Sequence, residues 1–530
     1  MDRRRFLAGT AALGAAGWSA ARPAFAAGEA ASTLRYIPQA DVTILDPLAT
    51  TAYPTRNHGH MCWDTLYGLD AAFVPQPQLA EGHVVEDDGR RWTFTLRDGP
   101  LFHDGEKVRA QDAVASIQRW LPRDTHGQTL AQRLDAIRVI DDRRFEIRLK
   151  RPFALMLEAL GKVSGYPCFV YPERFARIDP TQPFTEVVGS GPYRFAADER
   201  VAGSQVVYRR FDRYVPTPVG APTMLAGPKL AHFERVEWKV INDPTTAAAA
   251  VQTGEVDWWE AVQPDLNPVL AKARDVKLVR IDNGGFYCSL RLNQLHPPFD
   301  DPAVRRALLK AVSQPDFMAA VAGDETNWKA GIGVFAAGSP LASDESLSVL
   351  TGPRDIAGAK AAIAAAGKAG SKLVALHARD IANQDALMSV GVDLFNKLGF
   401  DTVDAVSDWG TLLQRRANRR PPAEGGWNAL MALFSGLEMG SPAGHLLLRG
   451  NGDRAWFGWP NAPRLENLRD AWFDAPDAAA GGAIARQIQA QFFEDVPYVP
   501  LGQYFTNSAV RANLTGIRQG FPIPLNVKRG

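Results

Sequence analysis

Apolar and polar side chains alternate along several short segments of the chain. Trp92, Phe94 and Leu96 alternate with polar neighbours, and the same two-residue period recurs over residues 145–149 and 236–240. In a β-strand this period places the apolar side chains on one face. The pattern therefore predicts half-buried strands at 92–97, 145–149 and 236–240.

Other segments place apolar residues at the helical period. Residues 114–121 and 304–312 each have apolar side chains on one face of a helix, and the second follows an Asp-Pro pair suited to a helix start. An Ala-rich helix over 246–253 is expected to end at Gly254. Because helices and strands interleave along the chain, we expect a mixed α/β fold. Loops rich in Pro and Gly are expected around 216–228 and 419–426.

Length and charge limit the classes of protein to which this chain can belong. A chain of 530 residues, 46% apolar and 22% charged, is too long for one ordinary core, so two or three domains are expected. The first 26 residues carry a net charge of +3, which leaves the rest near −2. This near-neutral net charge gives no excess of basic residues that would predict binding to nucleic acid or to an anionic membrane. No later segment is apolar enough to predict a membrane span.

The N-terminus has the features of an export signal. Arg3-Arg4-Arg5-Phe6-Leu7 forms a twin-arginine pattern before an Ala/Gly-rich apolar stretch, and Ala24-Phe25-Ala26 suits signal peptidase. The alternative is a membrane anchor, but the stretch is shorter than the ~18–20 residues that a span needs. No cysteine for a lipid anchor stands at the cleavage point. We therefore expect a twin-arginine signal peptide over 1–26, cleavage after Ala26 and a periplasmic protein.

The cysteines and two neighbouring histidines are the candidates for redox or metal chemistry. Cys62, Cys168 and Cys288 allow three buried free thiols, or one disulfide and one free thiol. His58 and His60 lie close to Cys62, but residues two apart on a helix face different ways. A metal site needs three or four convergent ligands, so the sequence predicts no metal and no cofactor.

Motifs of hydrolases and nucleotide-binding enzymes were not found. The chain has no HExxH, G-x-S-x-G or Walker A sequence. Gly189-Ser190-Gly191-Pro192 lacks the first glycine of a nucleophile elbow, because position 188 is Val, and predicts a tight turn before a strand. No catalytic residue is therefore assigned, although a periplasmic hydrolase remains the alternative from another class.

A set of ordered motifs resembles one family, the extracellular solute-binding proteins of the peptide/nickel type (family 5), which includes dipeptide- and oligopeptide-binding proteins. The similar segments run from about residue 34 to residue 510. They include Thr43-Ile-Leu-Asp46-Pro47, Trp63–Tyr67, Leu79–Val114, Gly189–Tyr193, Tyr208–Tyr214, Gln252–Asp257, Pro298–Leu308 and Asp355–Gly367.

The resemblance implies a two-lobed periplasmic binding protein of the Venus-flytrap type. Lobe I is expected at 33–282 and 503–530, with the family's extra subdomain at 64–185, and lobe II at 283–502. The crossings between lobes are expected near Gly284, Gly285 and Gly502, where glycine can absorb hinge rotation.

The resemblance also suggests a loop for a ligand's ammonium group. Family members that bind peptides usually place aspartates there, but this chain has Phe434, Ser435, Gly436 and Glu438 in that stretch. Glu438 takes the place of an aspartate in one interpretation and is a solvated loop residue in the other. The missing aspartates argue against ordinary dipeptide binding.

Other candidate ligand-binding residues follow from the same resemblance. Arg379, after a predicted strand, is the candidate for a ligand carboxylate, because a guanidinium donates two parallel hydrogen bonds. Its alternative is an exposed or salt-bridged arginine. Trp409 and Phe434 resemble pocket walls, with core packing as the alternative, and Tyr53 is a candidate from lobe I.

The expected function is capture of a solute for an ABC importer. The ligand is expected to be a peptide or a peptide-like solute, with an opine-like conjugate or a metal chelate as alternatives. The expected partners are that ligand and the transmembrane subunits of an ABC permease, and a monomer is expected. A receptor that presents its ligand to a sensor has the same sequence features.

Overall fold

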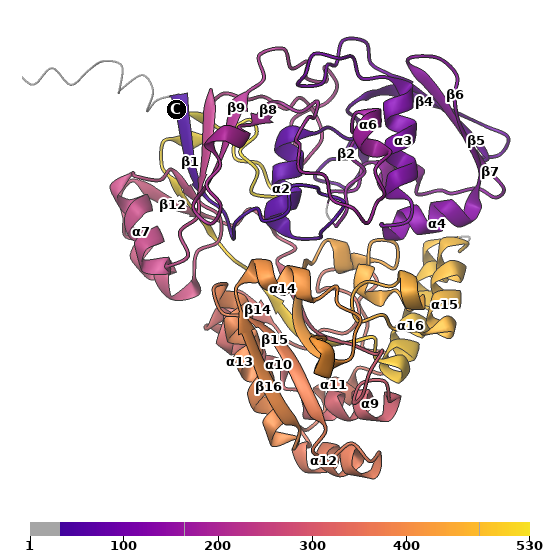
Figure 1. The fold of residues 1–530 in the computed structure, drawn as a ribbon, viewed down its shortest axis with the longest axis vertical. Helices are drawn as coiled ribbons and strands as arrows, with labels where there is room; N and C mark the ends of the chain where they lie inside the picture. Colours follow the sequence, from indigo (N-terminus) through magenta and orange to yellow (C-terminus); the bar gives the residue numbers. More distant parts are fainter. Residues whose placement is uncertain (1–31, 164, 476) are drawn as a thin grey trace, which may run out of the picture.

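The computed structural model describes residues 32–163, 165–475 and 477–530. The expected signal peptide and its cleavage site lie outside these residues. No helix within the described ranges has both the length and the apolar character needed to cross a membrane. The chain forms two lobes, with the indigo and magenta segments in one and most orange segments in the other (Figure 1).

The first lobe is built on a seven-stranded sheet in the order β12-β19-β11-β1-β10-β9-β8. β1 runs parallel to β10 and β11, and the other pairs are antiparallel. The strands are β1 (Thr33–Ile37), β8 (Tyr193–Phe195), β9 (Gln205–Arg210), β10 (Arg235–Lys239), β11 (Trp258–Trp259), β12 (Val276–Val279) and β19 (Ser508–Arg511). The remaining elements near this sheet are α2 (Tyr53–Cys62), α7 (Pro244–Thr253), α8 (Asn267–Leu270), β20 (Leu514–Thr515) and β21 (Lys528–Arg529).

A smaller antiparallel sheet stands beside the first, in the order β4-β5-β7-β6. Burial alternates along β5 as predicted, because Trp92, Phe94 and Leu96 face the core. The strands are β4 (Ala80–Glu86), β5 (Arg91–Leu96), β6 (Leu134–Val139) and β7 (Arg144–Leu149), and the neighbouring elements are β2 (Tyr67–Leu69), β3 (Pro75–Pro77), α3 (Ala110–Trp120), α4 (Thr125–Arg133), α5 (Met156–Leu160) and α6 (Glu173–Ala176).

The second lobe has a six-stranded sheet in the order β14-β18-β13-β17-β15-β16. Its strands are β13 (Phe286–Leu292), β14 (Trp328–Lys329), β15 (Lys372–Ala378), β16 (Asp401–Ser407), β17 (Ala429–Ser435) and β18 (Tyr498–Tyr504). Its helices are α9 (Pro302–Ala311), α10 (Gln314–Ala322), α11 (Ser348–Thr351), α12 (Ile356–Ala365), α13 (Ala382–Lys397), α14 (Trp409–Arg415), α15 (Pro463–Phe473) and α16 (Ala478–Asp495).

The predicted strands and helices are confirmed, including their local end signals. The Asp301 carboxylate accepts a hydrogen bond from the Ala303 amide at 2.8 Å and caps α9. Gly254 ends α7 in the left-handed conformation, with φ of 78°. Local sequence therefore determines where these helices begin and end.

Two short segments join the sheets of the two lobes. The first runs from the end of β12 to Phe286, and Gly284 and Gly285 lie in it. The second comes between β18 and β19, at 505–507, slightly later than expected. Gly502 lies inside β18 rather than in a crossing, because the strand continues to Tyr504. It stands at an irregularity of the β13–β18 pairing, with a φ of 116°.

A buried ion pair ties the segment after β1 to the smaller sheet's helices. Asp46, from the Thr43–Pro47 motif, accepts hydrogen bonds from both terminal nitrogens of Arg119 on α3, at 2.6 and 3.3 Å. Both side chains are fully buried. The Arg119 guanidinium also donates to the carbonyls of Ile178 and Gln182. Because its donors and charge are matched, this arginine belongs to the core.

The substitution Asp46→Asn tests this structural role. It leaves the Arg119 charge buried without its counterion, so the free energy of unfolding should fall by about 3–5 kcal/mol. Urea unfolding followed by circular dichroism measures the change. Asp393→Asn is the matched control, because Asp393 pairs with Lys397 on the surface and should change stability by less than ~1 kcal/mol. Equal effects of the two substitutions would contradict the assignment.

Candidate functional site

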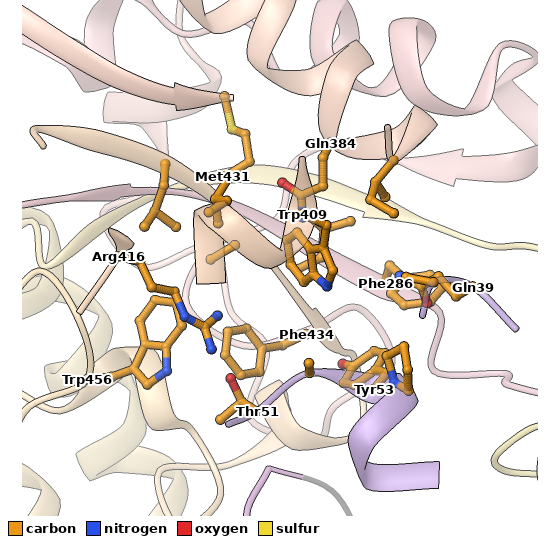
Figure 2. A pocket seen from close by; sticks show the side chains of 18 residues that line it. Gln39, Thr51, Tyr53, Phe286, Gln384, Trp409, Arg416, Met431, Phe434 and Trp456 are labelled. Carbon is orange, nitrogen blue, oxygen red and sulfur yellow. The ribbon is translucent and has the colours of Figure 1, made fainter. Parts of the chain in front are cut away.

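A cavity between the lobes, here called the large chamber, is lined by residues of both. Thr51 and Tyr53 of the first lobe and Trp409, Arg416 and Phe434 of the second face it (Figure 2). The other lining residues are Gln39, Ala40, Ala52, Pro54, Phe286, Ile381, Gln384, Leu412, Leu430, Met431, Ala432, Leu433 and Trp456. Its walls are therefore mainly aromatic and aliphatic, and both lobes contribute to them.

Helix α14 positions one wall of the large chamber. The Asp408 carboxylate caps this helix by accepting from the Thr411 amide at 2.9 Å. Trp409, Leu412 and Arg416 follow at positions i, i+3 and i+7, so they share the face that meets the chamber. The cap and the helical period together present a tryptophan and an arginine to the same space.

Strand β17 supplies the adjoining wall. The Phe434 ring meets the Trp456 indole edge-on, with ring centroids 5.6 Å apart. β17 pairs with both β13 and β15, so its backbone hydrogen bonds are made inside the sheet. Phe434 is thus held on a rigid strand, as a site wall requires.

A second cavity, the small chamber, adjoins the first. Tyr53 and Phe286 line both chambers, and their ring centroids are 5.7 Å apart. Arg56, Glu260 and Asp282 line the small chamber only. The two chambers therefore differ in chemistry, because two carboxylates and one guanidinium face the small one.

Burial shifts the pKa values of the small chamber's ionisable groups. The Arg56 guanidinium lies between the Tyr53 and Phe521 rings, 4.2 and 4.0 Å from their centroids, and burial lowers its pKa. Burial raises the pKa of Glu260. It also raises the pKa of Asp282 to about 6, although the Gly284 amide donates to this carboxylate at 2.7 Å and opposes the shift.

Side-chain hydrogen bonds cross between the lobes around the large chamber. The Tyr53 hydroxyl donates to Glu438 at 3.4 Å, and the Arg416 guanidinium donates to the Thr50 hydroxyl at 3.1 Å. Further away, the Thr125 hydroxyl donates to the Ala443 carbonyl at 2.8 Å, and the ion pair of Arg133 with Asp474 spans 2.8 Å. The structure therefore shows the lobes in contact around the site.

The structure brings three of the sequence-predicted residues together, since Tyr53, Trp409 and Phe434 all line the large chamber. Ser435 and Gly436 instead face the crossing segment. The Ser435 hydroxyl donates to Asp282 at 3.2 Å, and the Gly436 amide donates to the Gly285 carbonyl at 2.8 Å. These two residues contact the first crossing and do not line either chamber.

The two charged candidates have different surroundings. Glu438 is 7% exposed, so the interpretation as a solvated loop residue is wrong. The Arg379 side chain is 60% exposed, lines neither chamber, and lies 3.5 Å from Asp385 and 3.6 Å from Asp404. The carboxylates beside Arg379 belong to the protein itself.

Several cleft residues were not predicted from the sequence, above all Arg416, Trp456 and Asp282. Arg416 had a detectable signal, because Trp409, Leu412 and Arg416 have the spacing of one helix face. Trp456 lies in a loop, and its role comes from tertiary packing alone. Asp282 was noted only as part of a crossing segment.

His58 and the three cysteines are buried in the protein core. His58 lies on α2, where its Nδ1 is 2.9 Å from the Tyr208 hydroxyl and burial lowers its pKa to about 3. Over the ranges that the structure describes, no three His, Cys, Asp or Glu side chains converge as metal ligands. Cys62, Cys168 and Cys288 are buried free thiols, which is one of the two expected arrangements.

The chain has two lobes with separate sheets, two crossings and a cavity between the lobes. These features define a two-lobed periplasmic binding protein. The chain belongs to the bacterial extracellular solute-binding proteins, family 5, whose model matches residues 74–431. This family comprises solute-binding proteins and is not an enzyme family.

Individual relatives agree with this assignment. The chain is 35% identical to a probable peptide ABC transporter periplasmic-binding protein, y4tO, of Sinorhizobium fredii, over 90% of both chains. It is 29% identical to the glutathione-binding protein GsiB of Salmonella typhi, over 57% of this chain and 56% of that protein.

Solved structures share the fold. AgaA from Agrobacterium tumefaciens R10, in complex with agropinic acid, matches with a TM-score of 0.77 and 21% identity, over 94% of this chain and 99% of that one. DppA from Helicobacter pylori, in complex with the peptide STSA, has a TM-score of 0.77 and 19% identity, over 94% and 98%. These matches establish the two-lobed α/β architecture.

The raised pKa of Asp282 predicts a pH-dependent effect of Asp282→Asn. Above pH 6 the native state holds a buried carboxylate whose ionisation is disfavoured, whereas in the unfolded chain it ionises near pH 4. Stability associated with the protonated form is present below pH 4 and is lost as pH rises through 6. Asp282→Asn should therefore raise the free energy of unfolding by about 3 kcal/mol at pH 7.5, since one pKa unit corresponds to ~1.4 kcal/mol.

Urea unfolding at pH 7.5, 5 and 4 measures this difference. The gain should shrink at pH 5 and be nearly lost at pH 4, where the carboxyl group is protonated in the native state and about half ionised in the unfolded chain. Asp393→Asn, on the surface, is the control and should show no such trend. A variant less stable than wild type at pH 7.5 would exclude a destabilising carboxylate at this position.

Proposed function

We propose that this chain is the solute-binding component of an ABC importer and takes up a peptide or a peptide-like solute in the periplasm. The observation that carries the proposal is the large chamber, because residues of both lobes line one cavity. The relative from Sinorhizobium fredii, named for peptide transport and 35% identical over 90% of both chains, supports the same class.

Capture would work through closure of the lobes. A ligand in the chamber touches Tyr53 from one lobe and Trp409 and Phe434 from the other, so these contacts coexist only when the lobes meet. Contacts made in one state alone shift the population toward that state. The permease then distinguishes the closed, loaded form from the open form. The solute is released chemically unchanged, and the protein forms no covalent bond with it.

The site's composition supports a peptide-like solute over a bare metal ion. Aromatic and aliphatic walls suit apolar groups, while the hydroxyl of Thr51 and the amide of Gln384 offer hydrogen bonds to an amide backbone. An opine-like conjugate shares this chemistry with a peptide. A chelate would have to bring its own ligands, because no metal-ligand cluster occurs among the described residues.

The same proposal includes export through the twin-arginine route, with cleavage after Ala26. It also includes a monomeric state and docking to the transmembrane subunits of the permease. Replacing Arg3 and Arg4 together with lysine should keep the precursor in the cytoplasm, because that export route requires the arginine pair. Cell fractionation with immunoblotting measures this retention. Normal accumulation of the double variant in the periplasm would exclude the route.

Ligand binding should stabilise the mature protein in a thermal-shift screen of peptides. A ligand at 100 times its Kd adds about 2.7 kcal/mol to the free energy of unfolding. For a peptide that binds, Trp409→Ala should weaken the affinity at least tenfold, since it removes an aromatic wall worth over ~1.4 kcal/mol. Isothermal titration calorimetry measures this change.

Trp328→Ala is the matched control for Trp409→Ala. Both tryptophans are half-buried residues of the second lobe, but Trp328 lines neither chamber. Its replacement should leave the affinity within about twofold. If both variants lost affinity equally, the large chamber would not be the binding site. If no peptide shifted the wild-type melting curve, the proposed function would fail.

A further inference from the structure

Arg416 is the one charged residue among the 18 that line the large chamber. The side chain is 5% exposed. Figure 2 shows its guanidinium between Trp456 and the Phe434 ring, with Thr51 below. The chamber therefore combines a single positive charge with aromatic and aliphatic walls.

The hydrogen-bonding capacity of Arg416 is mostly unused. One terminal nitrogen donates to the Thr50 hydroxyl at 3.1 Å, and Nε has no hydrogen-bond partner among the described residues. The guanidinium carbon lies 5.5 Å from the Trp456 ring centroid and 4.7 Å from that of Phe457. Within the described part of the chain, Arg416 forms no salt bridge with Asp or Glu.

The electrostatic surroundings of Arg416 increase its need for an anion. Its pKa is lowered to about 10, mainly by burial; Tyr166 opposes this shift and the like charge of Arg123 contributes to it. The group is therefore still protonated at neutral pH. A buried charge without a counterion is strongly destabilising, which is why buried guanidinium groups in proteins are normally paired or fully hydrogen-bonded.

Arg291 provides the contrast within the same lobe. It is fully buried on β13, and it also lacks a carboxylate partner among the described residues. Its guanidinium nevertheless donates to four backbone carbonyls, at 2.6 to 3.1 Å. Arg291 is thus satisfied by the fold, whereas Arg416 faces a cavity with open donors.

We propose that Arg416 binds a carboxylate group of the transported solute in the large chamber. The inference rests on the proposed function and adds the ligand class: a peptide-like acid whose apolar part packs on Trp409, Phe434 and Trp456. A guanidinium matches a carboxylate because it can donate two parallel hydrogen bonds. The carboxylate would also neutralise the buried charge. Arg416 takes the role that the sequence suggested for Arg379.

The first test compares N-benzoylglycine with its neutral amide, two probes that differ only in the charged group. Wild-type protein should bind the acid at least tenfold more tightly than the amide by calorimetry. Arg416→Gln should abolish this preference, and Arg416→Lys should retain it at lower affinity, since lysine keeps the charge without the planar fork. Arg379→Gln should behave as wild type.

Each contrary result overturns the inference. A preference that survives in Arg416→Gln, a preference lost in Arg379→Gln, or equal or undetectable binding of the two probes by wild type would exclude the assignment. The proposed function is judged separately, by thermal shifts with neutral peptide amides. If one of these contrary results is found while those amides still stabilise both wild type and Arg416→Gln, peptide capture stands and only the role of Arg416 falls.

A second test distinguishes a ligand-binding role from a structural one without any ligand. Arg416→Met in the ligand-free protein should melt at or above the wild-type temperature, because it removes an uncompensated buried charge and keeps similar volume. Arg291→Met should melt well below wild type, since four carbonyls lose their donors. If Arg416→Met also melted well below wild type, the residue would be structural.

A third comparison separates two sources of the carboxylate. Gly-Phe carries it at the peptide's C-terminus, Gly-Phe-amide has none, and Glu-Phe-amide carries it on a side chain. Tighter binding of either acid, lost in Arg416→Gln, supports the site and identifies its source. Equal affinity for all three peptides contradicts a carboxylate subsite.

Discussion

Each lobe of this protein completes its own backbone hydrogen bonding, and the function depends on that constraint. The seven-stranded and six-stranded sheets share no strand, and only the segments at 280–285 and 505–507 connect them. Separation of the lobes therefore breaks no ladder of a sheet. Side-chain contacts cross between the lobes, and a bound solute can add to them. A cavity that exists only between two independently stable bodies is suited to capture and release.

Buried charges in the molecule fall into two groups. Asp46 with Arg119 and the carbonyl-bound Arg291 are satisfied entirely by the fold. Arg416 faces the large chamber, where its Nε has no hydrogen-bond partner among the described residues, and Asp282 faces the small chamber, where burial raises its pKa. Since natural proteins tolerate destabilised groups mainly at functional sites, the second group marks the cleft as the place of binding. The groups that destabilise the ligand-free protein are therefore the ones that can contribute affinity for a solute.

Local sequence patterns were sufficient to predict the helices and strands, but they predicted fewer of the residues that line the binding site. Strand β5 and helix α9 follow from a two-residue period and an Asp-Pro cap, which involve only neighbouring residues. Trp409 and Phe434 were found because motif resemblance placed them near a cleft. Arg379 was the candidate for a ligand carboxylate because it follows a predicted strand, yet its neighbours Asp385 and Asp404 come from other elements.

The sequence by itself determined the α/β class, the positions of most strands and helices, and the family, since these depend on local periods, caps and the order of motifs. Only the tertiary structure decided that Gly502 lies within a strand, that Glu438 is buried, and that Arg416 faces a cavity without a carboxylate partner among the described residues. The physical reason is that burial and charge compensation depend on residues far apart in the chain. Thr50 and Arg416, 366 positions apart, meet only when both lobes have folded and closed.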